Sequence, residues 1–595
     1  MDDQRSSQTA TLTLEDDSTA WKRPSKVLLV LALIFAAGTI VLFTTTVVFV
    51  VQKNSLSNEL EQLKGTTSDL CLTEECIMAA ASVFSNMNRD RQPCDNFFEY
   101  ACGGWIKQRQ LQGVYDIDVL GEIGTDVKKN LNGLLQQDSQ PNEPVTISQL
   151  RNFYNSCIDT DTINSLGAKP LTDLLESLGG WPVLGANPGG NWKSGAFDFE
   201  KLWADLRGQY GQDMIINIGL ESNSITGEQV LVISVPPFVV TQLNFREDKN
   251  KGVVSLVAEP VSEPDDFGKK ILLEKKFSKE RQAYLQYMIN VATSLGANST
   301  AAKEEMTEVL EFETTMSNFS QDQPTLEMTT LGQLELNYGD IDWARFFELV
   351  MPASVDPPVT NDEIIGNGAP EYVGQVSRWL KQQDNRVIAN YMVWRIVCIS
   401  TAFLSQQFQQ HRLKYLSVVR SASPAASTSQ EGDCVDNGIK YLPYAMGRIY
   451  VDEYFSEDTK KQTLRMIGNL QTAFKSMLTT NDWLQDEDKG AAAEKANAMS
   501  VEIGYPDWIK NDAKLDAFHA GITFKTKELF NNVLTFLRWK TPKQLARLRE
   551  NPIAMTLWDR IKPTEVNAQY NQLLNGIVFP AAILQPPVYN AELPW

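Results

Sequence analysis

The sequence contains only two histidines, His411 and His519, which lie 108 positions apart. Histidine is the commonest metal ligand and general base in proteins, so this scarcity limits the available chemistry. Neither histidine has another at metal-site spacing, and there is no C-x-x-C pair, no G-x-S-x-G turn and no phosphate-binding loop. The acidic run Asp482–Asp488 could supply paired carboxylates or begin a solvated helix, and we favour the helix. We therefore expect structural or surface roles for both histidines, with no metal ligand and no catalytic residue in this sequence.

The segment Val566–Gln585 has the pattern of a β-hairpin. An apolar and aromatic run, Val566–Tyr570, is followed by a polar turn, Asn571–Gly576. A second β-rich run, Ile577–Phe579, then ends before a proline. An isolated hairpin is marginal in water and needs a third strand or a helix over its apolar face. That covering element must come from upstream, from another chain, or from a segment that this sequence does not contain.

Composition is typical of a globular protein and excludes one class of partner. The 595 residues can form several domains or one two-lobed body, and 43% apolar residues can fill a sizeable core. The net charge of −20 argues against nucleic-acid binding, which needs concentrated lysine and arginine. We interpret the charge as an aid to solubility.

An uncharged run of 25 residues, Val27–Val51, follows a polar N-terminal tail. As a helix it would be roughly 37 Å long, enough to cross a bilayer core of about 30 Å. A cleaved signal peptide is the alternative, but no clear small-x-small cleavage site is present. Basic residues before the run predict a cytoplasmic N-terminus and a chain outside the cell after Gln52. We expect a single-pass type II protein of the cell membrane. The basic residues are Lys22, Arg23 and Lys26.

This topology would place all seven cysteines where disulfides persist. Two glycosylation sequons, beginning at Asn298 and Asn318, lie on the same side. Because seven is odd, at least one thiol lacks a partner within the chain. The cysteines are Cys71, Cys76, Cys94, Cys102, Cys157, Cys398 and Cys434.

From Asp69 onward the sequence is mostly helical in pattern, so we expect a mainly α fold with a smaller β component. Thr146 and Gln149 resemble a capping box that opens a helix. The main internal β signal is Met214–Val235. Further helices are expected at Ser278–Leu295, Lys303–Ser317, Tyr391–Tyr415, Thr459–Leu484 and Gly490–Met499.

Four segments, in order, resemble the neprilysin and endothelin-converting-enzyme family of zinc metallopeptidases. They are CDNFFEYACGGW (Cys94–Trp105), MGRIYVDEYF (Met446–Phe455), the segment Trp483–Ile509 with its IGYPDWI ending, and VNAQYNQLLNGIVFPAAILQPP (Val566–Pro587). The resemblance covers residue 69 to the end. It implies a large helical N-terminal lobe and part of a thermolysin-like catalytic lobe, on a single membrane-spanning helix.

The resemblance also implies a cysteine pattern, with Cys71 bonded to Cys76 and Cys157 bonded to Cys434. The family counterparts of Cys94 and Cys102 pair with cysteines near the C-terminus, but this sequence has none after Cys434. Cys94, Cys102 and also Cys398 are therefore expected to be unpaired. A bond between Cys94 and Cys102 is the alternative, and a continuous helix would hold them roughly 12 Å apart, too far for a disulfide.

Family members hydrolyse peptide bonds with zinc held by an H-E-x-x-H helix, in which two histidines face the metal and the glutamate polarises water. The sequence contains no His-Glu dipeptide. In the family this helix follows the segment matching Pro586 and Pro587, so we expect the sequence to stop before the catalytic centre. We expect zinc only in complete family members and no cofactor here.

Asn567 and Ala568 match the family positions that bind the substrate backbone on an edge strand. Gln569 departs from the usual aromatic residue there, and an ordinary structural strand is the alternative. The resemblance thus implies a membrane-anchored zinc metalloendopeptidase acting on small peptides and inactive as written. A non-catalytic surface protein that binds peptides or a partner is the other hypothesis. The unpaired thiols also allow a disulfide-linked dimer.

We expect the chain to be divided into five parts. They are a cytoplasmic tail at 1–26, a transmembrane helix at 27–51, a stalk at 52–68, a helical domain at 69–509 and the incomplete start of a catalytic domain at 510–595.

Overall fold

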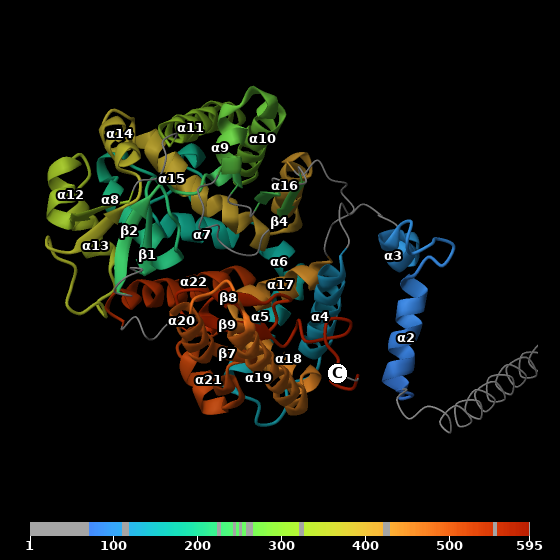
Figure 1. Ribbon diagram of the computed structural model, residues 1–595. Helices are drawn as coiled ribbons and strands as arrows, with labels where there is room; N and C mark the ends of the chain where they lie inside the picture. The colour runs from blue at the N-terminus through green and yellow to red at the C-terminus, as the bar shows by residue number, and fades with distance from the viewer. Residues whose placement is uncertain are drawn as a thin grey trace, which may run out of the picture. The chain divides into compact units, whose positions relative to one another are not determined.

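The computed structural model describes residues 71–109, 118–222, 228–241, 245–248, 253–256, 266–320, 326–419, 429–550 and 556–593 (Figure 1). The expected tail, membrane helix and stalk lie outside these residues. The chain divides into two compact units, Met1–Ala101 with Glu592–Trp595, and Cys102–Ala591, and each is described by itself.

The first unit contains α2 (Glu74–Asn86), whose first turn is closed by the Cys71–Cys76 disulfide. Thr73 caps this helix by accepting a hydrogen bond from the backbone N–H of Cys76 at 3.3 Å. Helix α3 (Phe97–Gln108) crosses the division between the units. Cys94 precedes α3 and Cys102 lies within it, so the two cysteines are not on one continuous helix.

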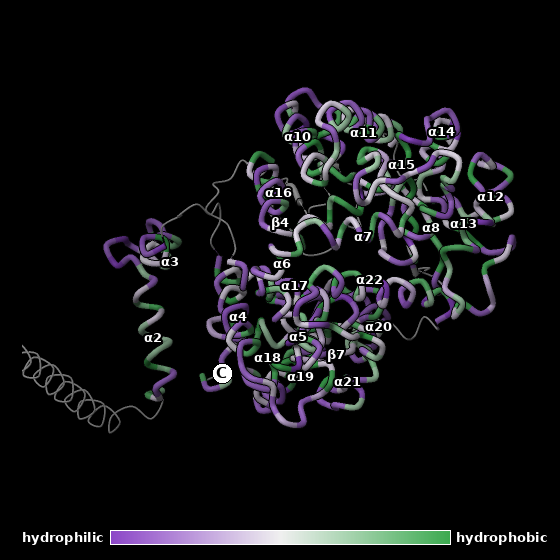
Figure 2. The backbone as a smooth tube through the Cα atoms, turned by 180° about the vertical axis from the view of Figure 1, so that it is seen from behind, coloured by the Kyte–Doolittle hydropathy of each residue, from purple (hydrophilic) through white to green (hydrophobic). Residues whose placement is uncertain are grey.

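The second unit is mainly helical. Its helices are α4 (Val119–Leu135), α5 (Val145–Ile158), α6 (Thr160–Leu166), α7 (Lys169–Ser177), α8 (Phe199–Tyr210), α9 (Asp266–Leu273), α10 (Ser278–Ser294), α11 (Ser299–Phe319), α12 (Leu331–Asn337), α13 (Trp343–Val350), α14 (Pro370–Leu380), α15 (Asn385–Ser400), α16 (Gln406–Val419), α17 (Gln430–Tyr441), α18 (Pro443–Tyr454), α19 (Glu457–Thr480), α20 (Asp486–Asn497), α21 (Asp512–Phe518) and α22 (Leu529–Ala546). In Figure 2 the outer helices α10, α11 and α12 carry both hydrophilic and hydrophobic stretches, as helices with one buried face do.

One hydrophobic core is built by helices α7 to α16 around a four-stranded sheet of order β1-β2-β6-β5. The internal β signal forms the antiparallel pair β1 and β2, as expected, and β6 joins β2 in parallel. The other strands of the sheet were not expected from the sequence. The strands are β1 (Asn217–Ser222), β2 (Gln229–Ser234), β5 (Glu327–Thr330) and β6 (Ile364–Asn367), and β3 (Phe245–Asp248) and β4 (Val253–Leu256) form a separate pair.

A second core is built from two stretches that are far apart in sequence. It draws residues from α4, α5 and α6 and again from α17, α18, α19, α21 and α22. Its sheet has the order β7-β9-β8, formed by β7 (Ser500–Gly504), β8 (Gln569–Asn571) and β9 (Gly576–Pro580). Helix α22 serves both cores, with Leu534 in the first and Val533 in the second. The boundary expected at residue 509 remains a prediction.

Two helix expectations are wrong in detail. Helix α5 has no side-chain cap of its own, so the capping box of Thr146 and Gln149 does not form. The expected helix Tyr391–Tyr415 is instead α15 followed by α16, with a bend of 108° between Asn385–Phe403 and Gln406–Val419. Among the described residues, no single helix is long and apolar enough to span a membrane, and this bent pair alone meets both criteria.

Candidate functional site

The expected hairpin is present, and its third strand comes from upstream. β8 and β9 pair antiparallel with Tyr570 opposite Ile577, and β7 pairs in parallel with the other side of β9. Figure 1 shows this sheet beside α19, which contacts β7. Of the three sources considered for a covering element, the upstream one is therefore correct, and the hairpin is not left uncovered. β8 is the edge strand.

Close packing fixes the register of β7 against β9. At one end, a Cβ on Gly576 would lie 2.2 Å from Ser500 Oγ and 2.6 Å from a Leu557 methyl group. At the other end, Gly504 has a positive φ of 78°, and a Cβ there would lie 2.4 Å from the Phe455 ring. A side chain at Gly504 would be strained as well as crowded, and one at Gly576 would force Ser500 and Leu557 to move, so both ends of the pair are closely packed.

The expected strand Val566–Tyr570 is shorter than predicted, because β8 begins at Gln569. Asn567 and Ala568 thus lie in the extended lead-in to the edge strand and not within it. Asn567 is exposed, and its Oδ1 accepts a hydrogen bond from the Ala568 N–H at 2.8 Å. Ala568 packs against the second core, which holds this lead-in at the edge of the sheet.

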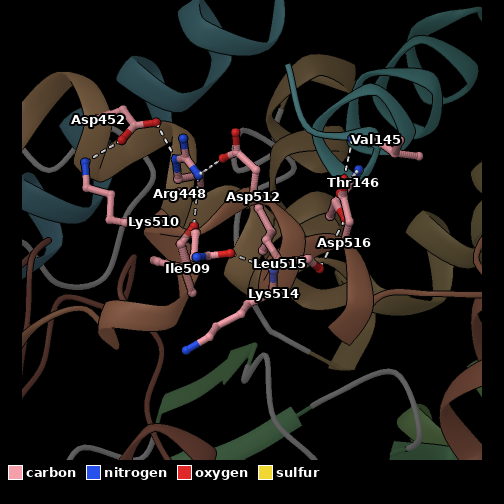
Figure 3. A network of polar contacts seen from close by, with 11 residues as sticks. Val145, Thr146, Arg448, Asp452, Ile509, Lys510, Asp512, Lys514, Leu515 and Asp516 are labelled. Carbon is pink, nitrogen blue, oxygen red and sulfur yellow. Dashed lines mark hydrogen bonds and ion pairs between the residues drawn. The ribbon is translucent and has the colours of Figure 1, made fainter. Parts of the chain in front are cut away.

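A polar network that was not expected from the sequence fixes the region before α22 (Figure 3). The guanidinium of Arg448 on α18 donates to Asp512 at 2.7 Å, to Asp452 at 2.6 Å and to the carbonyl of Ile509 at 3.0 Å. Lys510 adds an ion pair with Asp452. The network ties the segment after β7 to α18.

Asp516 supplies the cap that α5 lacks. Its carboxylate accepts hydrogen bonds from the backbone N–H groups of Val145 at 3.1 Å and Thr146 at 2.8 Å (Figure 3). Burial alone would raise the pKa of Asp516, but these hydrogen bonds hold it below the ordinary value. A carboxylate some 370 positions away therefore joins the two stretches of the second core.

The sequence profile of peptidase family M13 matches residues 93–506. The chain belongs to peptidase family M13. It is 28% identical to neprilysin-2 of Drosophila melanogaster over 557 residues, and 29% identical to membrane metallo-endopeptidase-like 1 of Mus musculus over 554. Each alignment covers 89% of this chain and 67% of the relative. The resemblance inferred from the four motifs is confirmed.

The M13 fold is also that of solved bacterial structures. The zinc metalloprotease ZMP1 of Mycobacterium tuberculosis matches with a TM-score of 0.63 at 18% identity, covering 85% of this chain and 70% of that one. PEPO of Lactobacillus rhamnosis matches with a TM-score of 0.64 at 16% identity, covering 85% and 73%. These likenesses confirm a mainly helical M13 fold.

M13 members are zinc metallopeptidases, so we tested whether residues of this chain could hold zinc. No group of three His, Cys, Asp or Glu side chains suited to a metal occurs within the part of the chain that the structure describes. His411 Nε2 lies 3.0 Å from the hydroxyl of Ser294, and burial lowers the pKa of His411. His519 is buried with Nδ1 3.0 Å from the carbonyl oxygen of Leu515, and burial lowers its pKa to about 4. Neither imidazole belongs to such a group, so the described residues do not fit a zinc site.

The cysteines of this M13 relative pair as the resemblance implied. In the second unit, Cys157 on α5 is bonded to Cys434 on α17, and in the first unit Cys71 is bonded to Cys76. Cys94, Cys102 and Cys398 are free thiols. Cys398 is fully buried, and burial raises its pKa to about 12, so it is inert at neutral pH.

Both sequon asparagines are exposed. Asn298 caps α11, with Oδ1 accepting a hydrogen bond from Thr300 N–H at 2.9 Å. Asn318 lies in the last turn of the same helix. The acidic run begins α20, where Asp486, Glu487 and Asp488 are exposed in the first turn, as in the solvated-helix interpretation.

Proposed function

We propose that this M13 relative binds extended peptides along β8 and does not hydrolyse them with the residues of this sequence. The observation that carries the proposal is the edge position of β8, with Asn567 and Ala568 leading into it. An edge strand can add a peptide as a further strand through main-chain hydrogen bonds. The absence of an H-E-x-x-H segment from the sequence supports the lack of hydrolysis.

We further propose that the protein is anchored by Val27–Val51 with its body outside the cell. Support comes from the charge asymmetry around that run and from the two disulfides, which persist in oxidising surroundings. The relative named membrane metallo-endopeptidase-like 1 is consistent with such an anchor. A free thiol such as exposed Cys94 would allow a disulfide-linked dimer.

The test uses the full chain purified in detergent. Zinc is measured by mass spectrometry, cleavage with a quenched fluorescent peptide, and binding by the anisotropy of a fluorescein-labelled pool of random nonapeptides. We expect saturable binding without stoichiometric zinc or cleavage. Stoichiometric zinc together with chelator-sensitive cleavage would overturn the proposal that hydrolysis is lacking.

A pair of variants tests the binding edge itself. Asn567→Ala removes the side chain at the start of the edge and should weaken peptide binding about fivefold, equivalent to roughly 1 kcal/mol. Gln572→Ala removes an exposed amide from the turn of the same hairpin and should leave binding unchanged. Equal effects of the two variants would show that β8 is an ordinary structural strand.

The second candidate is a complete zinc endopeptidase. The M13 relatives contain further sequence beyond the aligned part, which covers 67% of their length. Sequencing the transcript past the codon for Trp595 separates the candidates. A reading frame that continues into an H-E-x-x-H helix would make the longer product the peptidase.

A further inference from the structure

Two lysines on neighbouring helices lie near the junction of the two cores, and the charge of a third cation, Arg412, acts on one of them. Lys440 ends α17, Lys540 lies on α22 and Arg412 lies on α16. Two aromatic rings hold the lysines near each other, because Tyr441 and Phe536 pack with ring centroids 4.8 Å apart. The Nζ of Lys440 lies 5.6 Å from the first ring, and the Nζ of Lys540 lies 5.8 Å from the second.

None of these three cations has a hydrogen-bond or ion-pair partner among the described residues. The Nε of Arg412 is fully buried without a hydrogen-bond partner. Other cations of the second unit behave differently, as Arg448 contacts two carboxylates and Arg549 donates to Glu363. The chain has 74 acidic and 54 basic residues, so a cationic group without a carboxylate runs against its composition.

The other two cations act electrostatically on Lys440. Burial lowers the pKa of Lys440, and the charges of Lys540 and Arg412 lower it further. Burial also lowers the pKa of Lys540. Water nevertheless reaches Lys440, whose side chain is exposed, although protein surrounds it closely enough to disfavour its charge. A small solute can therefore reach at least one of the cations.

We propose that Lys440, Lys540 and Arg412 form a binding site for a doubly charged oxyanion, either a phosphate or a dicarboxylate. Two ammonium groups and a guanidinium can surround such an anion with charge-assisted hydrogen bonds, and the buried Arg412 Nε would gain a partner. The anion would also relieve the repulsion that Lys540 and Arg412 exert on Lys440. The site lies on α16, α17 and α22, apart from β8, so it stands independently of the peptide-binding proposal.

Isothermal titration of the full chain in detergent tests the site, with inorganic phosphate and succinate as probes at constant ionic strength. We expect at least one probe to bind saturably at concentrations up to roughly 10 mM. Lys440→Gln and Lys540→Gln should each weaken that binding about tenfold or more. The probe that binds more tightly identifies the preferred oxyanion.

Lys543→Gln is the matched control on α22. Lys543 donates to the carbonyl of Phe518 at 3.3 Å and lies over the Trp539 ring, so it has partners of its own. It should change probe binding by no more than about twofold. The Lys440 and Lys540 variants should also melt at or above the temperature of the unmodified protein, because each removes a repelled cation. The proposal is overturned if neither probe binds, or if all three variants bind equally well.

Discussion

Replacing Asp516 with alanine should loosen the first turn of α5. The carboxylate of Asp516 accepts hydrogen bonds from the N–H groups of Val145 and Thr146, and α5 has no other side-chain cap at this end. Removal of a capping acceptor typically costs about 0.5–2 kcal/mol. Because Asp516 is charged and lies at a helix N-terminus, we expect the upper half of that range, about 1–2 kcal/mol.

Hydrogen exchange measured by mass spectrometry on a peptide covering 143–152 gives a local readout. A loss of about 1–2 kcal/mol should speed exchange at the start of α5 about 5- to 30-fold. This local measurement suits a chain with two cores, for which one global unfolding free energy is poorly defined. Asp482→Ala, at an exposed position outside any helix, is the control and should exchange like the unmodified protein. Unchanged exchange in Asp516→Ala would refute the assignment of the cap.

The pH dependence supplies a second check on Asp516. Its pKa in the folded protein lies below the ordinary value of 3.8, so its contribution to stability is full above about pH 4. The contribution is lost as the pH falls through the lowered pKa. The difference in melting temperature between the unmodified protein and Asp516→Ala should therefore be constant near neutrality and shrink below about pH 4. A difference that grew on acidification would contradict the sign.

Three further predictions concern separate features. Replacing Cys157 and Cys434 with serine opens a loop with a sequence separation of 277 and should lower the stability of the folded state by about 5 kcal/mol. The loss should appear as a lower midpoint of urea unfolding. Reduction of the unmodified protein should lower the midpoint in the same way. Burial raises the pKa of Glu313 from 4.5 to about 7, so the stability of the protein should fall as the pH rises between these two values. In Glu313→Gln the melting temperature should change less with pH over this range. An unchanged pH dependence in the variant would exclude Glu313 as the cause of the fall. Deletion of 27–51 should release the protein from membranes in carbonate extraction. In the membrane-bound protein, Asn298→Gln should lower the apparent mass by one glycan that glycosidase treatment also removes.

The sequence pattern predicted those strands that are determined by residues close to them in the sequence. The hairpin was predicted from two β-rich runs around a polar turn that ends in Asn575-Gly576, and β1 and β2 from two apolar runs in Met214–Val235. The third strand, Ser500–Gly504, was missed because only five residues form it and its partner β9 lies more than 70 positions downstream. A parallel pair leaves no turn signal between its strands.

The candidate site shows the same limit. Asn567 and Ala568 were placed at the edge by motif resemblance, but the start of β8 was misplaced by three residues because pairing with β9 decides it. The cap of α5 could not be read locally, since Asp516 belongs to another helix. The bend between α15 and α16 was hidden because both helices are apolar enough to continue one pattern.

Packing in the second core makes the proposed peptide binding separable from hydrolysis. β9 is fixed by Gly576 against Ser500 and by the fully buried Val578, so the sheet is positioned by residues of this sequence. The edge strand β8 is held in turn by its register with β9. A binding edge built in this way does not need zinc for its shape, whereas hydrolysis needs ligands that these histidines do not supply. Loss of binding in Asn567→Ala and absence of zinc are therefore independent results, and either one can fail without the other.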